Sequence, residues 1–261
     1  GDPYRAFLNW IDEIQRLIGE RRWLLLTIDE FSRIDGAIRS GRMDERIFST
    51  LRTLIEQYPQ VAVALCGNFT LAESHPLWRE ALKSAQTIPV NYLDRDAARR
   101  VLTKPALDFP DGVYSEAAID QVLESTNGQP YLLQLIGDRV VNQYNRSREQ
   151  LPDDAPSGLP ISVEVIVAAE SQALAAGDNA LASIWQWALR IGSDQDLVAP
   201  FLRGIARGEP LESLGDSETR AELLDLFCER DLLTQDAKGM IYFRVPMLAR
   251  WISIQRRLPR I

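Results

Sequence analysis

Two short runs of apolar residues, at positions 23–28 and 61–66, lack any alternation of polar and apolar side chains. Runs of this kind are typical of strands that are buried on both faces of a sheet. The apolar residues of positions 42–58 recur at helical spacing, and so do those of positions 3–18, which begin with an Asp-Pro pair suited to a helix start. The order strand, helix, strand predicts two adjacent parallel strands joined by a crossover helix.

A third candidate strand covers residues 87–93, and the proline within it restricts such a strand to the edge of a sheet. From residue 94 onward the pattern is helical. Residues 146–161 hold three prolines and one glycine among polar residues, which indicates a linker. We expect helices at 95–103, 115–125, 130–145, 163–175, 178–191, 196–207 and 218–230.

The end of the chain combines a hairpin with a last helix. Residues 232–245 contain two short apolar stretches around an Asp-Ala-Lys-Gly turn, and a helix follows from Pro246. Three helices, a hairpin and a closing helix are typical of a winged helix. The fold class that we predict is α/β, followed by an all-α region and a winged helix. We place the boundaries at 1–93, 94–145, a linker at 146–162, and 163–261.

Composition excludes several classes of protein. The chain has 261 residues, a formal net charge of −8, two cysteines and one histidine. An acidic chain argues against wholesale nucleic-acid binding, and two cysteines cannot form a disulfide framework. The sequence has no apolar run near the ~20 residues of a membrane span and no secretory signal pattern. We therefore expect a cytoplasmic protein with no membrane partner.

Several residues that could carry chemistry have simpler interpretations. His75 is expected to be a surface residue, because no partner lies at metal-ligand spacing in the sequence. Cys66 and Cys228 are expected to be core thiols. Arg250 belongs to a basic tail that we interpret as a solvated helix end.

The sharpest chemical feature is the pair Asp29-Glu30, which directly follows the first apolar strand. Ligands of open α/β folds bind at the carboxyl ends of the strands. There, Asp29 could hold a Mg²⁺ ion that neutralises phosphate charge, and Glu30 could orient or deprotonate the attacking water. This is the Walker B pattern. The alternative is that the two acids are ordinary loop residues.

Beyond this pair, the order of segments resembles the AAA+ superfamily, and specifically its STAND branch of signal-transduction ATPases. The resemblance covers roughly residues 1–257 and implies that the chain is the C-terminal half of the nucleotide-binding core, a helical lid and a winged helix. The matching segments are LLLTIDEF (24–31), VAVALCGN (61–68), HPLWREALKSAQTIPVNYL (75–93), VLTKPALDF (101–109), STNGQPYLLQLIGDRV (125–140) and FRVPM (243–247).

The resemblance also implies further site residues. Asn68 stands where related ATPases place a polar sensor of the attacking water or terminal phosphate, although an Asn after a Gly is also common in turns. Gly128 and Pro130 match a Gly-x-Pro motif whose proline lies against the bound nucleotide. The alternative reading of Gly-x-Pro is a helix stop followed by a helix start.

The implied function is a nucleotide-dependent signalling or assembly switch that uses ATP or ADP and Mg²⁺. The sequence departs from the family in one respect, because it has no Gly-x-x-x-x-Gly-Lys-Ser/Thr phosphate loop. It also begins with Gly-Asp-Pro rather than Met, and we expect it to be part of a longer protein. Hydrolysis then depends on a phosphate loop in the parent, and this fragment alone is expected to be inactive.

Two alternatives remain: a non-catalytic scaffold with an ATPase fold, and a DNA-associated, initiator-like ATPase. Residues 216–231 would include the recognition helix of the winged helix and hold six acidic against two basic side chains, which argues against DNA binding there. We expect protein partners instead, as a homo-oligomer or through sensor and effector domains outside this sequence. The acidic helix is expected to face Arg95, Arg99 and Arg100.

Overall fold

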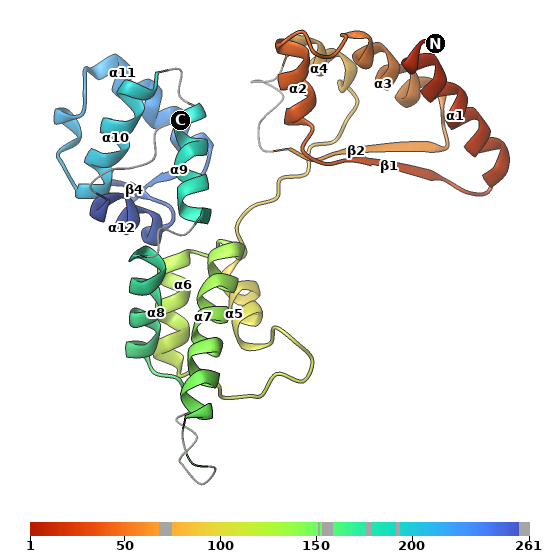
Figure 1. Ribbon diagram of the computed structural model, residues 1–261. Helices are drawn as coiled ribbons and strands as arrows, with labels where there is room; N and C mark the ends of the chain where they lie inside the picture. Colours follow the sequence, from red (N-terminus) through yellow and green to blue (C-terminus); the bar gives the residue numbers. More distant parts are fainter. Residues whose placement is uncertain (68–74, 151, 153–158, 176–178, 192–193, 256–261) are drawn as a thin grey trace. The chain divides into compact units, whose positions relative to one another are not determined.

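The structure is a computed structural model that describes residues 1–67, 75–150, 152, 159–175, 179–191 and 194–255. The chain forms two compact units, Gly1–Pro89 and Val90–Ile261, which are drawn in Figure 1 and described one at a time.

Within its described residues, the first unit contains two parallel strands and four helices. Strands β1 and β2 pair in parallel from Leu24 with Val61 to Ile28 with Leu65, which confirms the predicted pair of adjacent parallel strands. Figure 1 shows the helices of this unit on one side of the two strands. The elements are α1 (Pro3–Ile18), β1 (Leu24–Ile28), α2 (Ser32–Arg39), α3 (Arg46–Gln57), β2 (Val61–Leu65) and α4 (Pro76–Ala81).

Among the residues that the structure describes, only one face of this sheet is covered. Along β1 and β2, half-buried or buried residues alternate with exposed ones, and Leu25 is 62% exposed. The prediction of strands buried on both faces is therefore wrong within the described part of the chain. The covered face lies on a core that includes Ile11 of α1 and Leu51 and Leu54 of α3, each at most 1% exposed.

The segment after α4 also differs from expectation. Residues 87–93 form no strand, and Ile88 and Val90 are 76% and 91% exposed. The predicted edge strand is therefore wrong. The expected helix at 42–58 begins only at Arg46, and no helix was expected at the position of α2.

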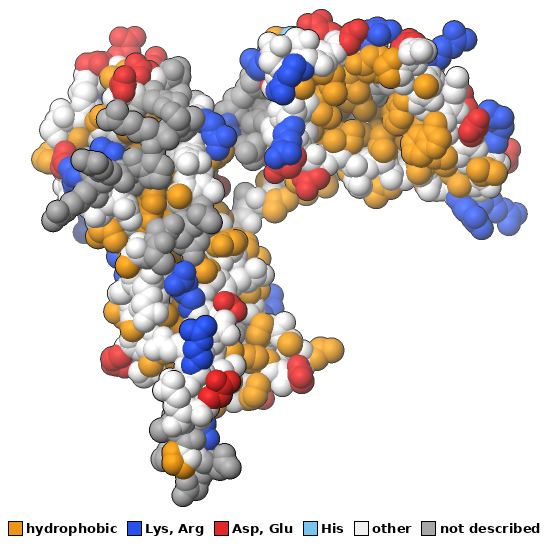
Figure 2. All heavy atoms as spheres, viewed as in Figure 1, with side chains coloured by type: hydrophobic (Ala, Val, Ile, Leu, Met, Phe, Trp, Pro, Cys, Tyr) orange, Lys and Arg blue, Asp and Glu red, His pale blue; other side chains and the backbone are white. Residues whose placement is uncertain are grey.

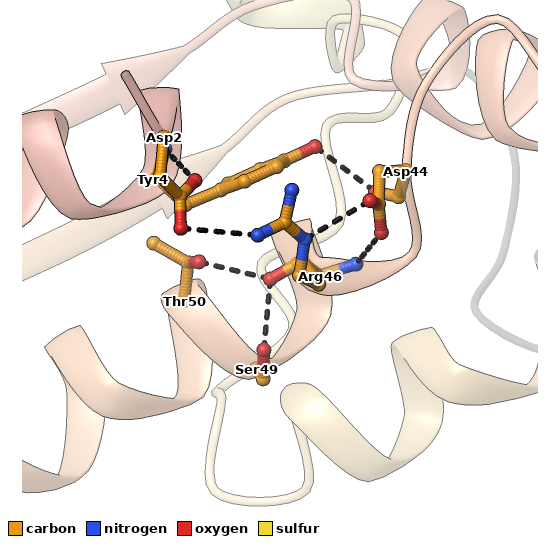
Figure 3. Close-up of polar contacts among 6 residues, drawn as sticks. All are labelled: Asp2, Tyr4, Asp44, Arg46, Ser49 and Thr50. Atoms are coloured by element: carbon orange, nitrogen blue, oxygen red, sulfur yellow. Dashed lines mark hydrogen bonds and ion pairs between the residues drawn. The ribbon is translucent and has the colours of Figure 1, made fainter.

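Arg46, the first residue of α3, is held in a network of polar contacts (Figure 3). Its guanidinium lies 3.0 Å from the carboxylate of Asp44, 3.0 Å from that of Asp2, and 4.9 Å from the centre of the Tyr4 ring. The Tyr4 hydroxyl donates in turn to the carbonyl of Asp44 at 3.1 Å. These contacts join the first turn of α3 to the first turn of α1.

The second unit is mainly helical. Its helices begin and end within four residues of the predicted positions, the largest difference being the end of α7 at Glu149 rather than 145. A short antiparallel hairpin stands at the predicted place. The elements are α5 (Arg95–Thr103), α6 (Glu116–Thr126), α7 (Pro130–Glu149), α8 (Val163–Ala175), α9 (Asn179–Ile191), α10 (Gln195–Arg207), η1 (Leu211–Ser213), α11 (Ser217–Glu229), β3 (Leu233–Gln235), β4 (Ile241–Phe243) and α12 (Pro246–Ile254).

One hydrophobic core runs through this whole unit, from Ala98 of α5 to Ile252 of α12. A half-buried ion pair joins α8 to α12, because the Glu170 carboxylate on α8 is 0% exposed and lies 2.8 Å from the guanidinium of the partly exposed Arg250 on α12. Arg250 is therefore not a purely solvated residue, as the sequence had led us to expect. Arg256 and the rest of the basic tail lie outside the described residues.

The arginines of α5 pair with a neighbour other than the one expected. Arg95 and Arg99 contact the carboxylates of Asp120 and Glu116, both on α6, at 2.5 and 2.6 Å. The expectation that they face the acidic helix α11 is therefore wrong. Within the described part of the chain, none of the helices combines the length and the hydrophobicity that a membrane span requires.

Candidate functional site

The two acidic residues lie at the carboxyl end of β1. Strand β1 ends at Ile28, and the side chains of Asp29 and Glu30 are both exposed directly after it. The carboxylate of Asp29 accepts a hydrogen bond at 2.8 Å from the backbone N–H of Glu30. Because β2 runs parallel to β1 and ends beside it, the carboxyl ends of both strands meet at this edge.

The backbone at Glu30 adopts an unusual conformation. Its φ is 53°, in the left-handed region that residues other than Gly seldom adopt. Such conformations cost about 1 kcal/mol or more and cluster at functional sites, where surrounding contacts hold them. The contact that holds this one is a hydrogen bond from the Phe31 N–H to the Cys66 carbonyl at 2.9 Å. The turn after β1 is therefore fixed against the end of β2.

Cys66 belongs to the same edge. It is exposed, so the expectation of a core thiol is wrong for this residue. The negative charge of Asp29 raises the pKa of its thiol, and partial burial and a hydrogen bond with the Asp29 carboxylate act in the same direction. The raised pKa of the Cys66 thiol thus reflects the negative charge at the place where the two strands end. Asn68, the predicted sensor, lies outside the described residues.

A buried carboxylate on α2, which the sequence did not reveal, stabilises the structure next to this edge. Asp35 of α2 is 8% exposed and accepts hydrogen bonds from the Trp78 indole at 3.0 Å and the His75 backbone N–H at 2.7 Å. Its other oxygen accepts from the Arg39 guanidinium at 2.7 Å. Trp78 packs edge-on against Phe31, with ring centroids 5.3 Å apart. The residue that follows the acidic pair is therefore anchored in the core.

His75 has a structural role that the sequence did not indicate. Its ring stacks on Phe48 with centroids 5.3 Å apart, and its Nδ1 accepts from the Leu77 N–H at the start of α4. The Nε2 atom lies 3.6 Å from a Glu45 carboxylate oxygen. The side chain is 24% exposed, so the prediction of a simple surface residue is wrong. No pattern local to the His-Pro pair could have shown the contacts with Phe48 and Glu45.

The Gly-x-Pro segment lies in the second unit, between α6 and α7. Gly128 is buried with a φ of 73°, and a Cβ added to it would lie 2.1 Å from the carbonyl oxygen of Leu93. Only glycine fits there without movement of the backbone. Pro130 is the first residue of α7 and is exposed, while the Asn127 side chain donates to the Arg244 carbonyl at 2.8 Å.

The acidic pair fits a magnesium ion that also binds phosphate. Among the described residues, no group of three or more His, Cys, Asp or Glu side chains is placed to hold a metal. Mg²⁺ differs from metals that need such a cage, because one or two carboxylates, phosphate oxygens and water commonly complete its shell. The carboxylate of Asp29 would hold this ion, which would neutralise phosphate charge. Asp29-Glu30 belongs to one unit and Gly128–Pro130 to the other.

Comparison with solved structures shows the fold. A Walker-type ATPase of Pyrococcus abyssi, PABY2304, matches with a TM-score of 0.51 at 14% sequence identity, over 89% of this chain. The chain spans 63% of the length of that ATPase. A RuvB variant of Thermotoga maritima matches with a TM-score of 0.42 at 18% identity, over 84% of this chain and 66% of its own. No protein-family model matches the sequence, and neither does any curated protein. The fold is thus similar to that of a Walker-type ATPase.

Proposed function

We propose that the chain is part of a STAND-type AAA+ ATPase that acts as a nucleotide-dependent signalling or assembly switch. The observation that carries the proposal is the acidic pair at the carboxyl end of a parallel strand, in a fold similar to a Walker-type ATPase. In this proposal Asp29 holds Mg²⁺ and Glu30 positions the attacking water. Asn68 senses the terminal phosphate, and Gly128 and Pro130 contact the nucleotide. The elements α9 to α12 and their hairpin form the winged helix, after a lid of α5 to α7.

The open face of the β1–β2 sheet supports a larger nucleotide-binding core in the parent protein. Parallel sheets are normally covered on both faces, whereas Leu25, Ala62 and Ala64 are exposed here. A further strand that carries a phosphate loop would extend this sheet at its edge, and the helix after that loop would cover this face. Without that loop the chain has no cradle for the phosphates, so hydrolysis belongs to the parent protein.

The test compares two substitutions in a full-length parent that contains the phosphate loop. Glu30→Gln is expected to leave nucleotide binding nearly intact and to slow hydrolysis by about 10²–10⁴-fold, the usual effect of losing a positioned base. Asp29→Asn is expected to weaken Mg²⁺-dependent binding instead. Glu13→Gln on the exposed surface of α1 is the matched control and should change neither quantity. Equal hydrolysis by the parent and Glu30→Gln would remove Glu30 from the mechanism.

The alternatives make different predictions. A non-catalytic scaffold would neither bind nor hydrolyse nucleotide in the full-length parent. A DNA-associated ATPase would bind duplex DNA with an affinity that falls steeply with salt. The acidic surface around α11, visible in Figure 2, opposes DNA binding through this helix, because residues 216–231 carry a net charge of −4 from six acidic and two basic side chains. We propose protein partners, either further copies of the chain or sensor and effector domains, in the cytoplasm.

A further inference from the structure

A pocket of about 650 Å³ lies in the second unit, between α5, α7 and the loop that connects α5 to α6. Its residues do not include Gly128 or Pro130, so it is distinct from the proposed nucleotide contact. Pockets of about 300–1,000 Å³ commonly hold small organic molecules. The volume therefore suits a ligand rather than a few water molecules.

The pocket is hollow because small residues stand where large ones could pack. Gly137 lies on the wall that α7 provides, and a Cβ at this position would make ordinary contact with Leu102 at 3.6 Å. Ala97 lies on the opposite helix. The remaining wall is mainly apolar and includes Val101 and the aromatic ring of Phe109. The loop that connects α5 to α6 also carries Leu107, which is fully exposed. Most of a bound molecule would thus meet hydrocarbon.

Tyr114 supplies a phenol at this pocket. The residue is only 6% exposed, it lines the pocket, and its hydroxyl has no hydrogen-bond partner among the described residues. The hydroxyl is not among the buried, unpaired polar atoms of the described side chains, so water or a bound molecule can reach it. Burial raises the pKa of Tyr114 to about 12, so the phenol keeps its proton at neutral pH and remains a donor.

Two cations stand at the same pocket. Arg100 is exposed at its rim, and within the described chain its guanidinium makes no ion pair. Lys104 is held in place by Asp111 at 2.7 Å and by the Phe109 carbonyl at 3.2 Å. The one acid of the wall, Asp138, accepts a hydrogen bond from the Asn142 amide at 2.9 Å. Tyr114 and Arg100 are therefore available to donate to a bound molecule, and a negatively charged acceptor is favoured.

We propose that this pocket binds a small amphipathic carboxylate, with its apolar body between α5 and α7 and its anionic head against Arg100 and Tyr114. The site is independent of the nucleotide, because none of its residues is placed in the nucleotide-binding machinery. Loss of nucleotide binding would leave carboxylate binding intact, and loss of carboxylate binding would leave nucleotide binding intact.

The experiment uses the 261-residue chain and isothermal titration calorimetry with two probes that share a body, 2-naphthoate and the neutral alcohol 2-naphthalenemethanol. Naphthoate is expected to bind saturably, and the alcohol at least about threefold more weakly. Gly137→Leu fills the pocket with a good helix former and should weaken naphthoate binding by at least about tenfold. Arg100→Gln and Tyr114→Phe should each weaken it by about three- to tenfold.

Arg146→Gln is the matched control, since Arg146 is exposed on α7 and does not line the pocket. It should bind naphthoate like the parent chain. Circular dichroism of each variant shows that the fold is retained. Three results would overturn the proposal: no saturable binding of naphthoate, unchanged binding by Gly137→Leu, or equal binding of the acid and the alcohol.

Discussion

Removal of the Arg250 charge is predicted to destabilise the second unit far more than removal of a surface arginine. Arg250→Met keeps most of the aliphatic stem but leaves the fully buried Glu170 carboxylate with one hydrogen-bond donor, the Gln121 amide at 3.1 Å. Breaking a buried ion pair costs about 3–5 kcal/mol because a charge remains without its partner. Since the Arg250 side chain is 43% exposed, water can reach part of the site, and we expect a loss of about 2–3 kcal/mol.

The double variant Glu170→Leu with Arg250→Met separates this penalty from the value of the pair itself. It leaves no buried charge, and a buried ion pair can often be replaced by apolar side chains at little cost. We therefore expect the double variant to lie within about 1 kcal/mol of the parent, which implies a coupling of about 2 kcal/mol. Arg99→Met is the control, because Arg99 pairs with an exposed Glu116 at the surface.

The assay is urea unfolding followed by circular dichroism and tryptophan fluorescence, with hydrogen exchange of the α8 peptides to assign the transition to the second unit. Arg99→Met should leave the midpoint of that transition unchanged. The reasoning is refuted if Arg250→Met costs less than about 0.5 kcal/mol, or if the double variant is as unstable as the sum of the two single variants.

Three further predictions test local features. Asp29→Asn should lower the raised pKa of the Cys66 thiol and so speed its alkylation at mildly alkaline pH by about two- to fivefold, measured by mass spectrometry. Gly128→Ala should cost about 2–4 kcal/mol in urea unfolding, because its Cβ would meet the Leu93 carbonyl and its φ is positive. Tyr114 has a pKa of about 12, above its ordinary value, so the folded state keeps the proton longer and stability should fall as the pH rises from about 10 through 12. Tyr114→Phe should reduce that fall, as followed by unfolding across this pH range; burial also raises the pKa of Tyr92 and Tyr58, so part of the fall should remain.

Helix positions in the second unit could be predicted because local side chains decide them. Asp94, Ser115 and Asp216 each accept a hydrogen bond from a backbone N–H in the first turn of the helix that follows. These N-cap interactions involve residues two or three positions apart, so the sequence contains the whole cause. The hairpin is equally local, since Asp236 accepts from backbone N–H groups of its own turn.

The first unit could be predicted less well because distant contacts decide it. Helix α2 is short and contains a glycine, and its one buried acid, Asp35, is bound by Trp78 and His75 some forty positions further on. No periodic pattern reveals such partners. The prediction that β1 and β2 are buried on both faces is wrong for another reason. An apolar run indicates that both faces of a strand favour burial, but it does not indicate whether a second layer of structure covers the sheet.

In the candidate site, too, local features could be predicted from the sequence, and features that depend on distant contacts could not. The position of Asp29 and Glu30 at a strand end follows from the apolar run before them, which the sequence shows directly. The left-handed backbone at Glu30 does not, because no glycine or asparagine stands there to indicate it. It results from the hydrogen bond between Phe31 and Cys66, which exists only once the two strands pair.

The Gly-x-Pro segment makes contacts that helix termination alone does not explain. Asn127 ends α6 in a left-handed conformation and Pro130 begins α7, so helix termination alone explains the proline. It does not explain the contacts beyond the helices. Gly128 accepts a hydrogen bond from the Leu93 N–H at 2.9 Å, and Asn127 donates to the Arg244 carbonyl beside β4. A movement of Pro130 would therefore act on the chain at Leu93 and on the hairpin at Arg244 at once, and the proposed switch would need coupling of this kind.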